Sequence, residues 1–168
     1  MIEDNSYLPY LLLLLLSCLG LSWFAGTDAP YVPTKMDKVS KILKAAGLKK
    51  GKVFYELGSG DGRVVLEAAR LGATAIGIEQ SWLRVWLSRF ITHKKKLKTA
   101  TFYHGNIYDR QYYPADCVYI YMLQKSVDTL EKKLQQELKK GAIVITQTYH
   151  FKKWKPFKTE GNFNFYKK

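Results

Sequence analysis

Cysteine, histidine and negative charge are all scarce in this sequence of 168 residues. The two cysteines, Cys18 and Cys117, are too few for the disulfide framework of a small secreted scaffold, which favours a reducing compartment. The three histidines lie at 93, 104 and 150, without the spacing of zinc ligands. Neither disulfides nor zinc are therefore expected to organise this chain.

Acidic residues are outnumbered by basic ones, 14 to 27, and the net charge is +13. The first thirty residues contain no Lys or Arg, so every basic side chain lies in the remainder. Such a positive field attracts either the anionic cytoplasmic face of a membrane or a nucleic-acid backbone. Composition leaves both alternatives open.

Charge is absent from residues 7–26, which include an unbroken leucine run at 11–16. At ~1.5 Å per residue this segment reaches the ~30 Å of a bilayer core, which predicts a transmembrane helix in contact with the lipid bilayer. Glu3 and Asp4 open the chain where an export signal carries positive charge, which also weakens a lipoprotein interpretation of Cys18. Lysines between 35 and 44 follow the segment, so the positive-inside bias predicts a single-pass membrane protein whose catalytic domain faces the cytoplasm.

The pattern divides the chain into a hydrophobic membrane anchor, residues 1–30, and one globular domain, residues 31–168. Thr34 and Asp37 resemble a capping box at the start of a helix that Gly47 ends. Strands are expected at 53–57, 74–79, 101–104, 117–122 and 142–149, with helices at 62–71, 81–96 and about 127–141 between them and a hairpin near 157–163. In the helix at 81–96, Trp82, Val85, Trp86 and Phe90 repeat at helical spacing.

Strands that alternate with helices predict an α/β fold with a doubly wound, mostly parallel sheet, here preceded by the transmembrane helix. The C-terminal hairpin is expected to form an antiparallel edge. In such sheets, ligands bind at the carboxyl ends of the strands, where the strand order reverses.

A glycine-rich loop, Glu56–Arg63, follows the first predicted strand, and its glycines allow close backbone approach to a ligand. Nicotinamide-binding proteins also use such a loop, but their fingerprint has Gly or Ala where Arg63 stands. Carboxylates at Glu56 and Asp61 would repel a pyrophosphate. They suit S-adenosylmethionine, which has no phosphate and two positive charges.

Glu79 ends the second strand, where a carboxylate can accept both hydroxyls of an adenosyl ribose, although a surface acid at a helix start is the alternative. Asn106 is placed to reach an adenine edge, with Ile107 against its face. The candidate cofactor-binding residues are Glu56, Gly58, Ser59, Gly60, Asp61, Gly62, Glu79, Gln80, Asn106 and Ile107.

From Tyr31 to the C-terminus the sequence resembles a family of small membrane-anchored protein-lysine methyltransferases. They are relatives of the enzymes that modify ATP synthase c-subunit and adenine nucleotide translocase, together with prokaryotic members. The matching stretches are Tyr31-Val32-Pro33-Thr34, Leu57–Arg63, Ala75–Glu79, Leu130-Glu131-Lys132-Lys133-Leu134, Glu137-Leu138 and Trp154–Gly161. The resemblance implies a seven-strand-type, Rossmann-like methyltransferase fold, S-adenosylmethionine as cofactor and a protein lysine near a membrane as acceptor.

One stretch departs from the family. Its members typically carry Phe-Pro-Phe-Pro-x-Trp after the fifth strand, where this chain has Tyr149-His150-Phe151-Lys152-Lys153-Trp154. Because both prolines are missing from a segment that can shape the acceptor site, the acceptor is the least transferable implication.

Methyl transfer from a sulfonium needs positioning more than acid-base groups, so no catalytic dyad is expected. A lysine acceptor must lose its proton first, which an aromatic, desolvating wall favours. Tyr31 and Tyr121 are the candidates for that wall, and ordinary core packing is the alternative.

Two further functions stay open. RNA methylation would use the lysines and aromatics interleaved in residues 151–158, and a scaffold would bind the cofactor without catalysis. The segment Tyr121-Met122-Leu123-Gln124 lacks the Asn/Asp-Pro-Pro-Tyr element of methyltransferases that act on amide or base amino groups.

Overall fold

The computed structural model describes residues 7–24 and 32–168. Its elements are α1 (Leu8–Phe24), α2 (Val39–Ala45), β1 (Val53–Leu57), α3 (Arg63–Arg70), β2 (Thr74–Glu79), α4 (Trp82–Lys94), β3 (Ala100–His104), the 3-10 turn η2 (Ile107–Asp109), β4 (Cys117–Ile120), α5 (Gln124–Glu137), β5 (Ile143–Gln147), β6 (Lys158–Glu160) and β7 (Phe163–Lys167). β1 and β2 have the predicted bounds, while β4 and α5 end earlier than predicted.

The seven strands form one mixed sheet in the order β3-β2-β1-β4-β5-β7-β6. Strands β1 to β5 pair in parallel, and β7 joins β5 and β6 antiparallel, as the hairpin pattern predicts. The order reverses beside β1, between β2 and β4. The carboxyl ends of these three strands therefore mark the expected binding edge.

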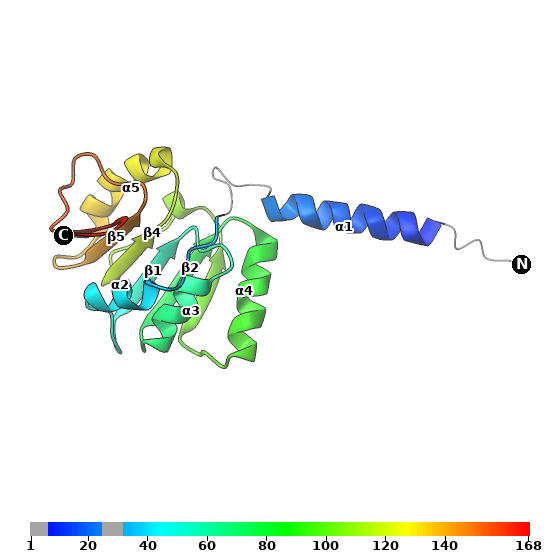
Figure 1. The fold of residues 1–168 in the computed structure, drawn as a ribbon, viewed down its shortest axis with the longest axis horizontal. Coiled ribbons are helices and arrows are strands. Elements are labelled where there is room, and N and C mark those ends of the chain that lie inside the picture. Colours follow the sequence, from blue (N-terminus) through cyan, green and yellow to red (C-terminus); the bar gives the residue numbers. More distant parts are fainter. Residues whose placement is uncertain (1–6, 25–31) are drawn as a thin grey trace, which may run out of the picture.

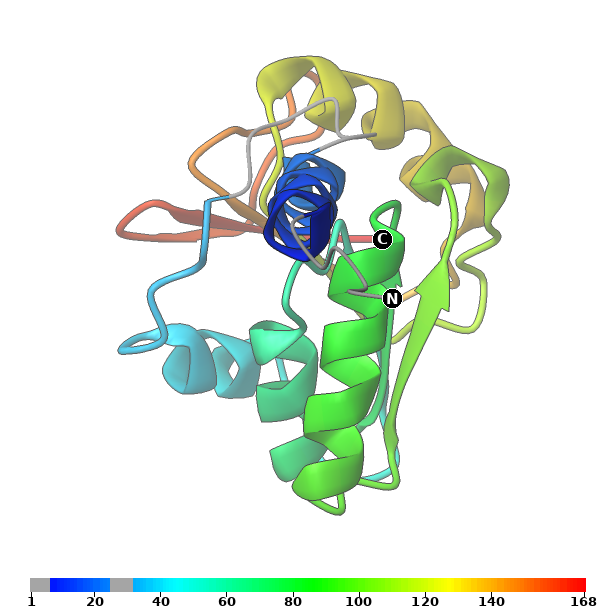
Figure 2. The same ribbon diagram turned by 90° about the vertical axis from the view of Figure 1, so that its right-hand side faces the viewer.

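Helices cover both faces of the sheet (Figures 1 and 2), so the predicted doubly wound α/β architecture is confirmed. One buried cluster joins α2, α3 and α4 to one face through residues such as Val39, Val65 and Phe102. The other joins α5 and the η2 segment to the opposite face through Leu130, Val118 and Ile107. Burial on both faces explains why the central strands are rich in apolar residues.

The predicted start of the first domain helix is wrong. α2 begins at Val39 with Lys38 at its N-cap and no side-chain capping bond. Thr34 is buried and hydrogen-bonded to Tyr119 on β4. The Thr34 hydroxyl, which the local pattern assigned to the helix N-cap, is therefore engaged in a tertiary hydrogen bond instead. Ser81, in contrast, caps α4 by accepting the backbone N–H of Arg84.

The prediction of a transmembrane helix is also wrong. No helix within residues 7–24 and 32–168 is both apolar and long enough to cross a bilayer. α1 has 17 residues, or ~25 Å at ~1.5 Å per residue, against a bilayer core of ~30 Å. The single-pass membrane localisation facing the cytoplasm, and the bilayer as a partner through residues 7–26, are therefore not supported. Residues 25 and 26 of that segment lie outside the described residues.

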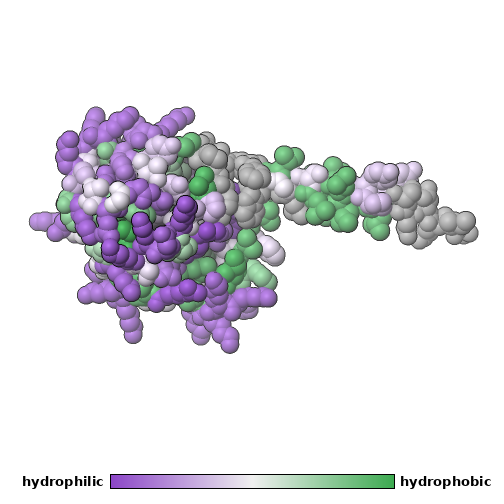
Figure 3. Space-filling model, viewed as in Figure 1, coloured by the Kyte–Doolittle hydropathy of each residue, from purple (hydrophilic) through white to green (hydrophobic). Residues whose placement is uncertain are grey.

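α1 projects from the α/β domain and contacts it at α4. It has a hydrophobic surface, because its exposed side chains include Leu8, Leu11–Leu16 and Leu21, whereas the domain is largely hydrophilic in the same view (Figure 3).

Candidate functional site

The loop between β1 and α3 is held in one conformation by backbone hydrogen bonds. The N–H groups of Gly58 and Ser59 both donate to the carbonyl of Ile78 on β2, each at 2.9 Å. The N–H of Gly62 donates to the Ser59 carbonyl at 2.8 Å, and Gly58, Gly60 and Gly62 all have positive φ. Because side chains strain this conformation, the glycines let the loop pack closely against the end of β2.

A cavity opens over this loop at the carboxyl ends of β1, β2 and β4. The loop, the linker before α2 and the segments after β2, β3 and β4 all contribute to its lining. Nine predicted site residues line it, namely Glu56, Gly58, Ser59, Gly60, Asp61, Glu79, Gln80, Ile107 and Tyr121. Gly62 and Asn106 are outside the lining, and Tyr31 lies outside the described residues. The Asn106 side chain accepts the backbone N–H of Tyr108 instead.

Glu79 is buried and makes four hydrogen bonds at the floor of this cavity. Its Oε2 accepts the N–H of Gly60 at 2.9 Å, and its Oε1 accepts the N–H of Ser81 at 2.9 Å. Oε1 also accepts Nε and Nη2 of Arg84, at 3.2 and 2.9 Å. The alternative of a surface acid is therefore wrong, because Glu79 is fixed inside the cavity by a buried ion pair.

One side chain in the cavity lacks a partner. The Oγ of Ser59 is the single buried side-chain N or O atom without a hydrogen bond across the described part of the chain. Since buried polar groups are rarely left unsatisfied, this orphan indicates a position for a ligand group. With Glu56 and Glu79 also in the lining, the donor set fits a cationic, phosphate-free cofactor such as S-adenosylmethionine. The carboxylates would hold its ammonium and ribose hydroxyls, and its sulfonium would supply the methyl group.

Glu56 carries a raised pKa. Its burial raises the pKa of the carboxyl well above its usual range, the N–H of Val65 acts in the opposite direction, and the charges of Asp61 and Glu79 raise it further.

Asp61 pairs with Arg63 at 2.5 Å. Arg63 also donates to the carbonyl of Thr34 at 3.2 Å, so the linker is tied to the loop across the cavity.

Replacing Glu56 by Gln should therefore remove a pH dependence of the stability and of the cofactor affinity. In the free protein the raised pKa means that this group stabilises the fold at low pH and that the contribution is lost as pH rises through the folded pKa. The variant should become more thermostable than the wild type as pH rises. Cofactor binding favours the ionised carboxyl, so wild-type affinity should rise with pH, by up to about tenfold per unit below that pKa. Calorimetric titration with S-adenosylhomocysteine across pH tests this; parallel profiles for the two proteins would contradict it.

The sequence reasoning missed several lining residues. Arg84, Met122 and Tyr108 reach the cavity from α4, the segment after β4 and η2. Their positions depend on how the elements pack, and no local pattern marks them. Val32, Pro33 and Thr34 also line the cavity, although the sequence pattern assigned Thr34 to a helix cap.

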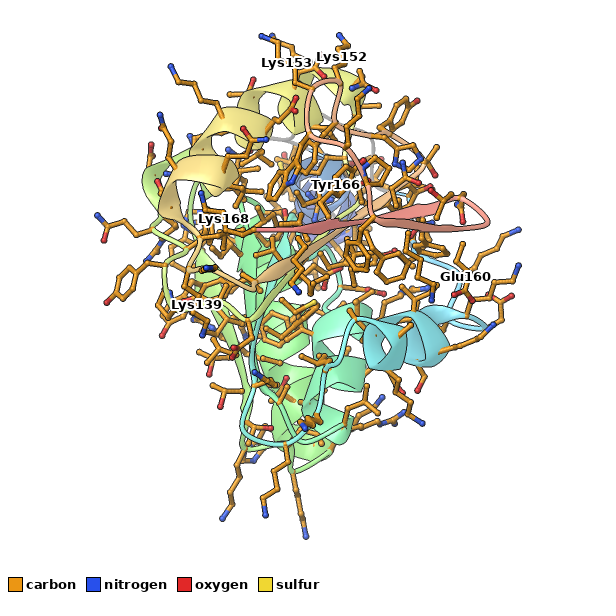
Figure 4. The ribbon with its side chains drawn as sticks, turned by 90° about the vertical axis from the view of Figure 1, so that its left-hand side faces the viewer. Lys139, Lys152, Lys153, Glu160, Tyr166 and Lys168 are labelled. Atoms are coloured by element: carbon orange, nitrogen blue, oxygen red, sulfur yellow. The ribbon has the colours of Figure 1, made fainter. Side chains whose placement is uncertain are left out.

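The Lys-rich segment after β5 is anchored by one carboxylate. Glu131 on α5 is buried and accepts the backbone N–H groups of Lys152, Lys153 and Trp154, the second at 2.9 Å. The ring of Phe151 stacks on Trp154, and both contact Tyr166. Lys152 and Lys153 extend outward (Figure 4). The segment thus has a fixed backbone although it lacks the two prolines of the family pattern.

Removing this carboxylate should loosen that segment. Glu131→Ala is expected to destabilise the segment locally by about 1.5–3 kcal/mol, because hydrogen bonds to a charged acceptor are lost. Hydrogen exchange should then accelerate at the amides of residues 152–154 and stay unchanged in β1. Glu67→Ala, in a partly exposed ion pair on α3, is the matched control. Equal protection of residues 152–154 in the two variants would refute the anchoring role.

Known proteins match this architecture. Residues 56–158 match the family described as the ANTKMT methyltransferase domain. The lysine N-methyltransferase of the ATP synthase c-subunit from Xenopus laevis is 35% identical over 128 residues, 76% of this chain and 56% of that protein. A protein-lysine N-methyltransferase of Saccharolobus islandicus is 29% identical over 142 residues, 80% of this chain and 88% of that protein. This chain therefore spans little more than half the length of the Xenopus relative.

A solved structure also resembles the chain. The RNA methyltransferase of Salinibacter ruber, in complex with S-adenosylhomocysteine, superimposes with a TM-score of 0.76 at 29% identity. The match covers 80% of this chain and 91% of that one. The cofactor predicted from the loop is confirmed as S-adenosylmethionine by these similarities.

Proposed function

The chain belongs to the ANTKMT methyltransferase domain family of S-adenosylmethionine-dependent enzymes, and from this premise we propose that it methylates the side-chain amine of a protein lysine. The observation that supports the proposal most is the position of Tyr121. Its ring borders the cofactor cavity and also a second cavity on the side of the linker. An acceptor that enters the second cavity would meet this aromatic wall beside the cofactor.

Methyl transfer requires this chain mainly to position the reacting groups. Bound S-adenosylmethionine would supply the methyl group and its sulfur would be the leaving group, so the residues around the cavity would have to hold the acceptor nitrogen about 3–3.5 Å from the methyl carbon. The lysine must first lose its proton, and a desolvating pocket lowers its pKa. Tyr121 and, from the linker, Tyr31 would supply the aromatic part of that pocket. The catalytic unit in this proposal comprises residues 31–168.

Isotope labelling tests the proposal. The purified full chain is incubated with tritiated S-adenosylmethionine and an extract of its source cells, and the labelled product is treated with protease or ribonuclease. Label that is released by protease and recovered as methyl-lysine after acid hydrolysis supports a protein lysine. Tyr121→Ala should reduce transfer by roughly a hundredfold because the acceptor is misplaced. Tyr113→Ala, at an exposed tyrosine, should not, and equal loss in both would refute the role of Tyr121.

RNA methylation is the second candidate. The structural similarity to the Salinibacter ruber RNA methyltransferase favours it, as does the net charge of +13. Lys152, Lys153 and Lys155 are exposed beside Phe157, a combination of cations and aromatic rings that binds single-stranded nucleic acid. Label that is sensitive to ribonuclease and absent from methyl-lysine would select this candidate.

A further inference from the structure

A second cavity of about 270 Å³ lies beside the cofactor cavity. The two share Val32, Pro33 and Tyr121 in their linings, so they meet at the linker and at the end of β4. The volume far exceeds the ~30 Å³ that one water molecule occupies in the liquid. A side chain that enters here would reach the wall that borders the cofactor.

One part of the wall of this cavity is apolar and the rest is polar. Val32, Pro33 and Phe163 face it together with the ring of Tyr121. Such a surface suits the four-carbon stem of a lysine, which buries readily against apolar groups. Lys35 and Lys38 outnumber the one carboxylate of the lining, Asp37, and nearby cations disfavour the protonated form of an entering amine. The lining thus favours the neutral amine that methyl transfer requires.

One buried polar side chain lines the cavity. Gln147, at the end of β5, is 7% exposed, and its Oε1 accepts the hydroxyl of Tyr119. Burial raises the pKa of Tyr119, so this phenol stays a neutral donor, and it is also hydrogen-bonded to Thr34. No described residue is found as a partner for the amide nitrogen of Gln147. This nitrogen is not among the fully buried atoms that lack a hydrogen bond, so it can donate to a polar ligand that enters the cavity.

The hairpin that forms the far wall is fixed in place. Asn162 lies at its turn, where its carbonyl accepts the N–H of Thr148 at 2.9 Å and its side chain donates to the Thr148 hydroxyl at 3.3 Å. Glu160 pairs with Lys41 of α2 at 2.7 Å, and Figure 4 shows Glu160 on the hairpin, beside that helix. The cavity is therefore a built feature with walls from the linker, β5 and the hairpin.

We propose that this second cavity admits the acceptor lysine of a polypeptide, with its stem against the apolar wall and Gln147 hydrogen-bonded to the acceptor segment. The inference rests on the proposed function, because it names the entrance through which that reaction receives its substrate. Gln147 is then a determinant of acceptor binding and makes no contribution to cofactor binding.

Blocking the rim of the cavity tests the entrance. Asn162→Cys is made in a Cys18→Ser background, where the remaining Cys117 is buried, and is alkylated with a bulky maleimide. Transfer from tritiated S-adenosylmethionine to the source-cell extract should stop after alkylation, while S-adenosylhomocysteine binds as before. Gln136→Cys, at an exposed site on α5, is the matched control and should transfer equally before and after alkylation. Undiminished transfer by alkylated Asn162→Cys, or loss of S-adenosylhomocysteine binding with it, would overturn the proposal.

Replacing Gln147 separates acceptor binding from a structural role. Gln147→Leu should raise the KM for the protein fraction by about tenfold, the effect of one lost hydrogen bond, with unchanged S-adenosylhomocysteine affinity. An unchanged KM, or a fall in kcat alone, would refute the role of Gln147. If the label proves to be in RNA and alkylation at residue 162 still blocks it, the cavity is the entrance but the lysine acceptor is wrong.

Discussion

Glu79→Ala is expected to lower the free energy of unfolding by about 3–5 kcal/mol, because it removes the acidic side of a buried ion pair with Arg84. The Glu79 and Arg84 side chains are 6% and 2% exposed, and their closest atoms lie 2.9 Å apart. The N–H of Gly60 also loses its acceptor. The substitution should weaken binding of S-adenosylhomocysteine by about tenfold or more, because hydrogen bonds to the ribose hydroxyls are lost.

A double-mutant cycle distinguishes the ion pair from cofactor binding. Arg84→Met removes the cation and keeps a long apolar side chain in the same space, so the double variant Glu79→Ala/Arg84→Met should be more stable than additivity predicts. Cofactor affinity should stay low in both proteins that lack Glu79. Denaturant unfolding and calorimetric titration measure the two effects. Additive stabilities, or full affinity in a folded Glu79→Ala protein, would contradict the roles given to these residues.

The sequence predicted the central sheet well because burial on both faces gives its strands a strong local pattern. β1 and β2 have the predicted bounds, and the hairpin predicted near 157–163 forms as β6 and β7 with its turn at Gly161 and Asn162. The same pattern placed Glu79 at the end of a strand, and in the structure Glu79 lines the cavity. Local periodicity thus located both the sheet and the edge at which the cavity opens.

The orientation of α4 shows what periodicity could not predict. Trp82, Trp86 and Phe90 repeat at helical spacing, yet all three are exposed, and the buried face carries Arg84, Val85 and Ser88. The reason is the site. Arg84 must reach Glu79, and the Ser88 hydroxyl donates to the Gly60 carbonyl at 3.4 Å, so polar side chains take positions that apolar ones usually occupy.

Long-range hydrogen bonds explain the other differences. The local sequence pattern predicts that Thr34 and Asp37 cap a helix, but Thr34 is hydrogen-bonded to Tyr119 on β4. Gln147 is in turn bonded to the same phenol. These three residues come from segments far apart in the sequence, so their contact becomes visible only when the strands are paired. The second cavity, which Gln147 lines, had no signal in the sequence.

Gly62→Ala is expected to cost about 2–5 kcal/mol of unfolding free energy, from backbone strain of about 1–2 kcal/mol and overpacking of about 1–3 kcal/mol. Gly62 has a φ of 78°, and a Cβ there would lie 2.5 Å from the Phe102 ring and 2.9 Å from the Ser88 hydroxyl. Gly47 provides the control, because its φ is 76° and a Cβ would meet nothing within 4 Å. Gly47→Ala should therefore show the strain alone. Because Gly62 closes the turn from Ser59, the displaced loop should also bind S-adenosylhomocysteine more weakly, whereas Gly47→Ala should bind it normally. Chemical denaturation and calorimetry of both variants test this, and equal stability and affinity would show that the loop does not depend on close packing against Phe102.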